Sequence, residues 1–183
     1  MSKEAIKYLV FTVKDRCRVC YTCVRGCPVQ AIKIINGQAE VIPERCIGCG
    51  NCVQVCSQGA KTFHNSTVAA LDLLESDNKV VACVAPSFPA EFAEIEDYRI
   101  LVGALKKLGF YKVTEVSFGA DIVADNYSKL LDNAKGKQYI SSDCPAIVSY
   151  VEKYYPNLID NMIPYHSPMD TMEKIIKENM EMM

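Results

Sequence analysis

Several features that would indicate a membrane or secreted protein are missing from this 183-residue chain. No apolar run approaches the roughly 20 residues that a helix needs to span a bilayer. The N-terminus, MSKEAIKYLVFTVKD, has only a short apolar stretch, which is broken at Lys14-Asp15 and has no small-residue cleavage site, so we do not interpret it as a signal peptide. We therefore expect no membrane association and a location in the reducing cytoplasm, where disulfides rarely persist.

Histidine and dense positive charge are also scarce. The two histidines, His64 and His166, stand alone in the sequence, and we interpret both as structural or surface residues. Residues 1–64 carry nine Lys/Arg and four Asp/Glu, whereas residues 65–183 carry eleven and eighteen. The basic residues of the first segment are interleaved with cysteines and form no dense run. We therefore expect them to balance anionic metal–thiolate centres, and we do not expect nucleic acid binding.

The ten cysteines are the most informative residues, because eight of them lie in two blocks with the same spacing. The blocks read CRVCYTCVRGCPVQAIKI and CIGCGNCVQVCSQGAKTF, and the last gap between cysteines is three residues in both. Internal repetition of this kind usually means two copies of one supersecondary unit about a pseudo-twofold axis. One departure is that Pro28 follows the last cysteine of the first block, whereas Ser57 follows that of the second.

Thiols this close together could be disulfide partners, zinc ligands, redox-active thiols or iron ligands. A reducing compartment disfavours disulfides, and zinc sites usually place their two cysteine pairs a dozen or more residues apart. Three cysteines at successive three-residue steps on one tight loop suit three corners of an iron–sulfur cube. The fourth cysteine then points away from its own loop and can complete the cube of the other repeat, as in two-cluster ferredoxins.

We therefore predict two 4Fe-4S clusters with crossed ligation. The first cluster is assigned to Cys17, Cys20, Cys23 and Cys56. The second is assigned to Cys46, Cys49, Cys52 and Cys27. Such a domain moves single electrons, so we expect a redox partner protein.

Beyond the cysteine blocks, apolar runs alternate with amphipathic segments, which indicates a parallel sheet with helical crossovers. The expected strands cover 79–86, 111–118 and 138–142. The expected helices cover 67–76, 89–108, 120–134, 145–154 and 169–183. The predicted fold class is an α+β ferredoxin-like domain with two 4Fe-4S clusters (residues 1–65), followed by an α/β domain with a short parallel sheet (residues 66–183). Cys83, in the middle of a predicted strand, is expected to be a small buried hydrophobic residue.

Residues 80–183 resemble the N-terminal part of the catalytic domain of iron-only (FeFe) hydrogenase large subunits. The matching stretches are VVACVAPSFPAEF, ALKKLGFYKVTEVSFGADIVADNYSKLL, and ISSDCPAIVSYVEKYYPNLI followed by SPM. Such subunits commonly carry a two-cluster ferredoxin module directly ahead of this region, as here. Cys144 lies between a predicted strand end and a helix start, where ligands are often placed and where free N–H groups favour a thiolate.

The resemblance implies roles for two adjacent residues. The family's motif reads Thr-Ser-Cys-Cys-Pro, and Cys144 takes the position of the cysteine that ligates the cubane part of the H-cluster. Asp143 takes the position of the proton-donating cysteine, and its carboxylate could still relay protons. The remaining cubane ligands of the family lie in later motifs, whereas this chain has only Cys83 and Cys144 outside the two blocks. An H-cluster is therefore expected only in a longer or assembled form, with a further hydrogenase segment or subunit.

Three functions follow from these observations. The first is an electron-transfer iron–sulfur protein of hydrogenase ancestry, expected to be a fragment of a hydrogenase-like subunit. The second is a redox-sensing regulatory module without hydrogen turnover. The third is an active hydrogenase, which requires another chain to supply the missing ligands.

Overall fold

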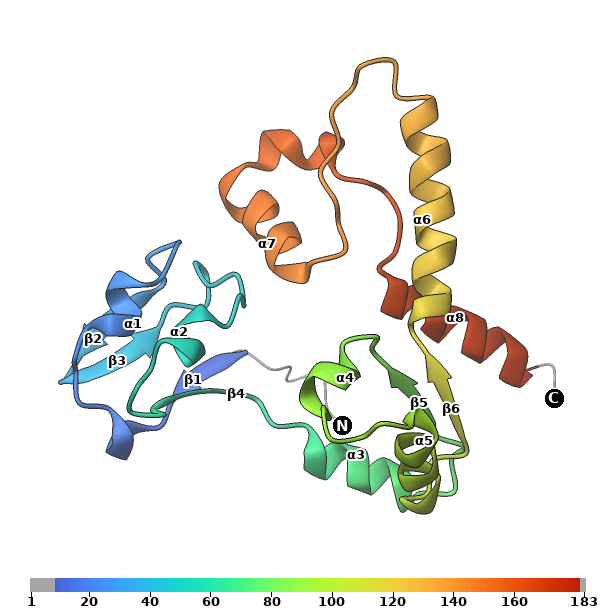
Figure 1. The fold of residues 1–183 in the computed structure, drawn as a ribbon. Helices are drawn as coiled ribbons and strands as arrows, with labels where there is room; N and C mark the ends of the chain where they lie inside the picture. Colours follow the sequence, from blue (N-terminus) through green and yellow to red (C-terminus); the bar gives the residue numbers. More distant parts are fainter. Residues whose placement is uncertain (1–8, 182–183) are drawn as a thin grey trace. The chain divides into compact units, whose positions relative to one another are not determined.

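The protein, whose computed structural model is described here over residues 9–181, is a mixed α/β chain that divides into two compact units. The first unit comprises Met1–Ser66 and Pro145–Asp160, and the second comprises Thr67–Cys144 and Asn161–Met183. Three two-stranded sheets are present in the described part of the chain, and one of them is parallel (Figure 1). The first unit contains both cysteine blocks.

Two antiparallel strand pairs form the frame of the first unit. One pair joins β1 (Val10–Thr12) to β4 (Lys61–Phe63), with Thr12 directly opposite Lys61. The other pair, β2 (Ile32–Ile35) and β3 (Gln38–Val41), is a tight hairpin. Its turn is Asn36-Gly37, where both residues have positive φ (48° and 71°), as a two-residue type I′ turn requires.

Short helical turns and thiols occupy the space between these strands. Each cysteine block supplies one single-turn helix, and a longer helix returns from later in the chain: η1 (Lys14–Arg16), α1 (Thr22–Arg25), α2 (Asn51–Gln54) and α7 (Pro145–Tyr154). The buried core is made of Cys23, Ile32 and Ala39, and Cys17 and Cys52 are among the residues that pack against it. Thiols therefore take the place of the large aliphatic side chains that usually fill such a core.

The second unit contains the parallel pair. Its elements are α3 (Thr67–Leu74), β5 (Val81–Val84), α4 (Phe88–Glu91), α5 (Tyr98–Lys107), β6 (Lys112–Glu115), α6 (Ser117–Asp132) and α8 (Pro168–Glu181). Strand β5 pairs with β6 in a register that places Val81 opposite Lys112 and Val84 opposite Glu115. Helix α6 packs against α8 in this unit. The 3-10 helix η2 (Pro156–Asn161) spans the boundary between the units.

The contact between α6 and α8 depends on a glycine. A Cβ at Gly119 would collide with the backbone oxygen of Pro168 and would lie 2.8 Å from Cγ of Met172. Met172 and Val123 are both buried at this contact, and Val123 lies one turn after Gly119 on α6. The absence of a side chain at residue 119 therefore lets the start of α8 approach α6 closely.

Two predicted elements of the second unit were wrong. The helix predicted over 89–108 is two helices, α4 and α5, because Asp97 is extended (φ −115°, ψ 111°) and its side chain accepts a hydrogen bond from the Arg99 N–H at 2.9 Å, which caps a new helix. The strand predicted over 138–142 is reduced to one parallel bridge between Ile140 and Met162. The chain leaves that pairing at Ser142, whose hydroxyl donates to the Ile163 and Tyr165 carbonyls.

The expected burial of Cys83 was also wrong: its side chain is exposed, because within residues 9–181 its strand has a single neighbouring strand. The helix predicted over 145–154 is confirmed as α7, and the one predicted over 67–76 is confirmed as α3. His64 and His166 are both exposed, in agreement with the surface interpretation. In residues 9–181 we find no helix with the length and apolarity that a bilayer crossing requires.

Candidate functional site

Two cavities in the first unit are each lined by four thiols. The first cavity is walled by the loop between β1 and α1 and by the end of the second cysteine block. Its thiols are Cys17, Cys20, Cys23 and Cys56. The structure thus brings together three cysteines of one repeat and the outlying cysteine of the other.

The second cavity repeats this arrangement with the blocks exchanged. Its thiols are Cys46, Cys49, Cys52 and Cys27. The open space is about 340 Å³ here and about 350 Å³ in the first cavity, each including the mouth of the cavity. Two spaces of almost the same size, with the same donor atoms, suit two groups of one kind.

The backbone of the two cysteine blocks has the same local conformation, 29 residues apart. Left-handed residues occur in matched pairs: Val19 with Gly48 (φ 53° and 71°), Tyr21 with Gly50 (62° and 75°), and Gln30 with Gly59 (49° and 56°). Only the second block uses glycine at these positions. Because a left-handed conformation is unfavourable for a β-branched residue such as Val19, the loop geometry must be imposed by its surroundings.

Backbone N–H groups donate to the outlying sulfurs in the same symmetric way. The Ala31 N–H donates to Sγ of Cys27 at 3.2 Å, and the Ala60 N–H donates to Sγ of Cys56 at 3.3 Å. The two loops are tied to each other by Nδ2 of Asn51, which donates to the Gly26 carbonyl at 2.6 Å. N–H groups aimed at sulfur stabilise the thiolate form, which is the form that binds metal.

Burial has the opposite effect on two of the thiols. It raises the pKa of Cys52 to about 11 and also raises the pKa of Cys23, while the positive charge of Lys61 lowers both. At Cys56 burial also raises the pKa, but N–H groups of residues 58, 60 and 61 together bring it below its ordinary value. The pKa of Cys20 is lowered by its hydrogen bond to Thr22. A thiolate at Cys52 therefore needs a nearby cation, which a bound metal supplies.

The donor set fits iron–sulfur groups. Each cavity offers four sulfur donors around an open space, which is the ligand set of a 4Fe-4S cluster. Among residues 9–181, no group of three or more His, Cys, Asp or Glu side chains stands together as a site for one metal ion. One thiol of each cavity, Cys20 in the first and Cys49 in the second, is exposed.

Cys144 and Asp143 lie outside these two cavities. Both side chains are exposed, and Cys144 immediately precedes α7. The Asp143 carboxylate accepts hydrogen bonds from the Tyr127 hydroxyl at 2.9 Å and from the Ser141 hydroxyl at 3.0 Å. The Tyr127 ring lies 6.1 Å from the Tyr165 ring, measured between centroids. The carboxylate is therefore oriented by two hydroxyl groups.

Helix α7, which follows Cys144, is bonded to the loop of the second cavity. Nζ of Lys153 donates to the Cys46 carbonyl at 2.6 Å and to the Pro43 carbonyl at 3.2 Å. The Tyr154 hydroxyl donates to the Arg45 carbonyl at 2.9 Å. The sequence analysis singled out neither Lys153 nor Tyr154. Since both side chains bind backbone carbonyls, no pattern in the sequence could have indicated their partners.

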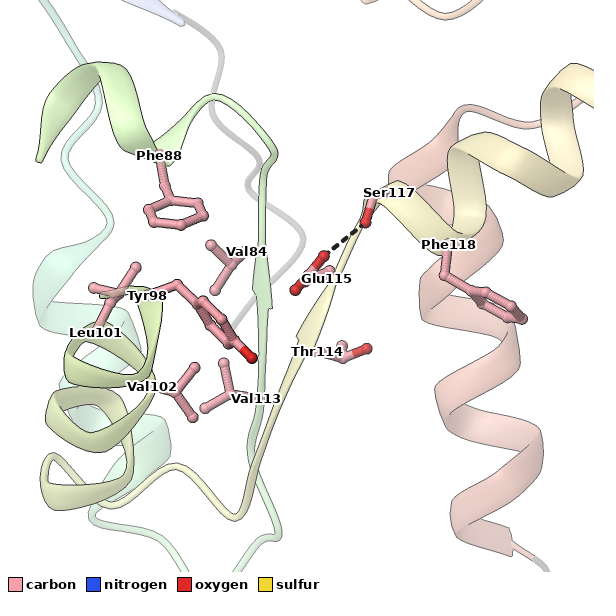
Figure 2. Close-up of a pocket in the computed structure, with 10 residues that line it drawn as sticks. All are labelled: Val84, Phe88, Tyr98, Leu101, Val102, Val113, Thr114, Glu115, Ser117 and Phe118. Atoms are coloured by element: carbon pink, nitrogen blue, oxygen red, sulfur yellow. Dashed lines mark hydrogen bonds between the residues drawn. The ribbon is translucent and has the colours of Figure 1, made fainter. Parts of the chain in front are cut away.

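A third cavity, with about 890 Å³ of open space including its mouth, lies in the second unit, and most of the side chains that line it are apolar. Figure 2 shows the Tyr98 ring between α5 and the strand pair, while Phe118 at the start of α6 points away from it. The hydrogen bond drawn there joins the Ser117 hydroxyl to the Glu115 carboxylate at 3.0 Å. None of the described residues that line this cavity is a cysteine or a histidine, so its chemistry differs from that of the two cysteine cavities.

Comparisons with known proteins match both parts of the chain. The family described as "Iron only hydrogenase large subunit, C-terminal domain" matches residues 78–183, and the "4Fe-4S dicluster domain" matches residues 9–57. The chain is 28% identical to the NADP-reducing hydrogenase subunit HndD of Solidesulfovibrio fructosivorans, over 89% of this chain and 33% of that protein. It is 26% identical to iron hydrogenase 1 of Clostridium pasteurianum, over 85% of this chain and 32% of that protein.

Two further likenesses are more distant. The cytosolic Fe-S cluster assembly factor NAR1 of Yarrowia lipolytica is 24% identical over 84% of this chain and 35% of that protein. A solved structure from a study of stepwise [FeFe]-hydrogenase H-cluster assembly has a TM-score of 0.45 at 25% identity, over 58% of this chain and 31% of that chain. The chain spans about a third of the length of these curated relatives.

Proposed function

The chain belongs to the family of iron-only hydrogenase large subunits, and from this premise we propose that it is an electron-transfer protein with two 4Fe-4S clusters in a ferredoxin-like first domain. The observation that carries the proposal is the crossed lining of the two cavities, each with three thiols from one repeat and one from the other. Cys17, Cys20, Cys23 and Cys56 would hold the first cluster. Cys46, Cys49, Cys52 and Cys27 would hold the second.

A 4Fe-4S cluster takes up and releases one electron at a time, at a potential set by its charge surroundings, its hydrogen bonds and its exposure. The N–H groups of Ala31 and Ala60 supply hydrogen bonds to one sulfur of each site. Exposed Cys20 and Cys49 give each site an edge at the protein surface. We propose that a redox partner protein exchanges electrons at these edges.

Iron and sulfide analysis of the anaerobically reconstituted chain tests this function. We expect about eight irons and about eight sulfides per chain, the content of two cubes, and a paramagnetic signal after addition of dithionite. The matched control is a variant in which all eight ligand cysteines are replaced by alanine, which should bind no sulfide. About one zinc per chain with no sulfide would refute the proposal.

A second candidate is a redox-sensing regulatory module without hydrogen turnover. The observation that favours it is Asp143, which stands where the family has a proton-donating cysteine and is held by two hydroxyl groups. One relative is named as a cluster assembly factor, a role other than hydrogen turnover. We expect no hydrogen evolution from this chain with a reduced viologen dye. A partner that binds the oxidised and reduced forms with different affinity would favour sensing over plain electron transfer.

Residues 66–183 would contribute Cys144 to an H-cluster only if the remaining ligands came from a further segment or subunit. In that assembly Cys144 is the proposed cubane ligand and Asp143 the proposed proton relay. Adding a subunit that carries the later motifs of the family, and measuring hydrogen evolution, would test this extension separately from the two-cluster proposal.

A further inference from the structure

Lys61 is the one charged or polar residue that is fully buried in the described part of the chain, with 3% of its surface exposed. The repeat offset of 29 residues makes Ile32 its counterpart. Ile32 begins β2 and is also buried, with 6% exposed, and Lys61 begins β4. One half of the repeat therefore has an aliphatic side chain where the other half has an ammonium group.

Within the described part of the chain, Lys61 makes its polar contacts to neutral groups. Its Nζ donates to Oγ1 of Thr12 at 2.6 Å and to the Ala39 carbonyl at 2.9 Å. Thr12 also donates to the Ala39 carbonyl. None of the ion pairs found within residues 9–181 includes Lys61. A buried charge without an opposite charge nearby is strongly unfavourable, so these contacts alone do not explain why an ammonium is kept here.

The surroundings of Lys61 suggest what would balance its charge. The side chain lines the first cysteine cavity. Its Nζ is bonded to the carbonyl of Ala39, which shares a small core with Cys23 of the first cavity, and Cys52 of the second cavity packs against that core. An iron–sulfur cube held by four thiolates is an anion, and it gains one more negative charge on reduction. The ammonium is thus placed to attract both groups, and each more strongly after reduction.

We infer that Lys61 is the internal counter-charge of both clusters and raises their reduction potentials. The inference rests on the proposed function. In the step concerned, each cluster gains one electron from a reduced viologen dye, which is oxidised, and no bond or proton changes. A fixed positive charge lowers the free energy of the more negative product, so the reduced form is favoured. The effect should be larger for the first cluster, because Lys61 lines that cavity.

A redox titration of the full, reconstituted chain, with viologen mediators and electron paramagnetic resonance, tests the inference. Lys61→Met removes the charge and keeps a long side chain, and Lys61→Ile reproduces the residue at the equivalent position of the first block. The matched control is Lys33→Met, since Lys33 is an exposed lysine on β2. At the wild-type midpoint of the first cluster, we expect the reduced-to-oxidised ratio to fall at least tenfold in both Lys61 variants, equivalent to about 59 mV for one electron. The second midpoint should fall by less, and the control should leave both unchanged.

The outcomes separate the two proposals. If the wild-type chain binds no iron and sulfide, the proposed function fails and this inference fails with it. If all chains load fully and the midpoints of the Lys61 variants match the wild type, only the inference fails. If Lys61→Met and Lys61→Ile do not load, Lys61→Arg decides. Loading of the arginine variant would show that the charge is needed to hold the clusters, whereas its failure would make Lys61 a packing residue and overturn the inference.

Discussion

Crossed and uncrossed ligation predict different numbers of intact clusters when two cysteines are substituted together. Cys20→Ala removes one donor from the first cavity, and Cys56→Ala removes another donor from the same cavity although it lies in the other block. Cys27→Ala removes a donor from the second cavity. If the thiols around each cavity hold one cluster, Cys20→Ala and Cys56→Ala both damage the same cluster, so the double variant keeps the other cluster. Cys20→Ala and Cys27→Ala damage different clusters, so that double variant loses both.

The magnitudes follow from the number of complete ligand sets. The wild type should hold about eight irons, and a cavity with two donors removed should hold none, so Cys20→Ala/Cys56→Ala should keep about four irons in an intact second site. In Cys20→Ala/Cys27→Ala each cavity has lost one donor, and neither can hold a complete cube. Three-thiol sites can still bind incomplete clusters, so iron content alone is not sufficient.

The assay therefore combines iron and sulfide analysis with paramagnetic resonance of the dithionite-reduced protein. We expect the signal of one complete 4Fe-4S cluster in Cys20→Ala/Cys56→Ala and no such signal in Cys20→Ala/Cys27→Ala. The reverse result, with an intact cube only in the second pair, would show that each block ligates its own cluster and would refute the assignment. Cys83→Ala, outside both cavities, should retain both clusters.

Three further predictions concern packing and reactivity. Gly119→Ala should destabilise the protein by about 1–3 kcal/mol in urea unfolding, because the new methyl group collides with α8. The control Gly103→Ala, on the open face of α5, should stabilise the protein by up to about 1 kcal/mol. Equal effects of the two substitutions would contradict the α6–α8 contact. Asn51→Ala should cost about 1 kcal/mol and speed cluster loss on heating, since it removes the bond between the two cysteine loops; an unchanged rate would contradict that role. The Cys83 side chain is exposed but loses part of its hydration to neighbouring groups, and this desolvation, together with the negative charge of Glu173, raises the pKa of its thiol. Alkylation of Cys83 should therefore require higher pH than alkylation of a free thiol, and Glu173→Gln should lower that pH in a mass-spectrometric time course; a pH profile that does not move would exclude the charge effect.

The cysteine sites could be assigned to two groups from the sequence because spacing constrains short loops tightly. Three-residue steps leave little freedom in where Cys17, Cys20 and Cys23 can lie, and the repeat supplies the same constraint at Cys46. The structure groups the thiols into the two sets that the spacing predicts. That these sets ligate clusters stays a prediction until iron and sulfide are measured.

The second unit was less predictable because a short apolar run does not indicate which strands or helices will pack against it. The break between α4 and α5 can be recognised in the sequence, because aspartate is a favourable N-cap residue and Asp97 accepts a hydrogen bond from the Arg99 N–H. This N-cap predicts two helices in place of one. The exposure of Cys83 had no such signal. An apolar run predicts a buried strand only when enough neighbouring strands and helices cover it, and the described part of the chain supplies a single partner strand.

The repeat also shows how two sites with the same ligands can be made different. Backbone conformation and the N–H bonds to the outlying sulfurs of Cys27 and Cys56 coincide between the halves, so these features give no reason for unequal potentials. A clear difference lies behind the ligands, where β2 begins with Ile32 and β4 with Lys61. A charge acts over a longer distance than a hydrogen bond. One residue difference between the halves can therefore give the two clusters different reduction potentials while every ligand stays in place. A lysine that aligns with a buried isoleucine is therefore a signal that can be found in the sequence alone, once the repeat is recognised.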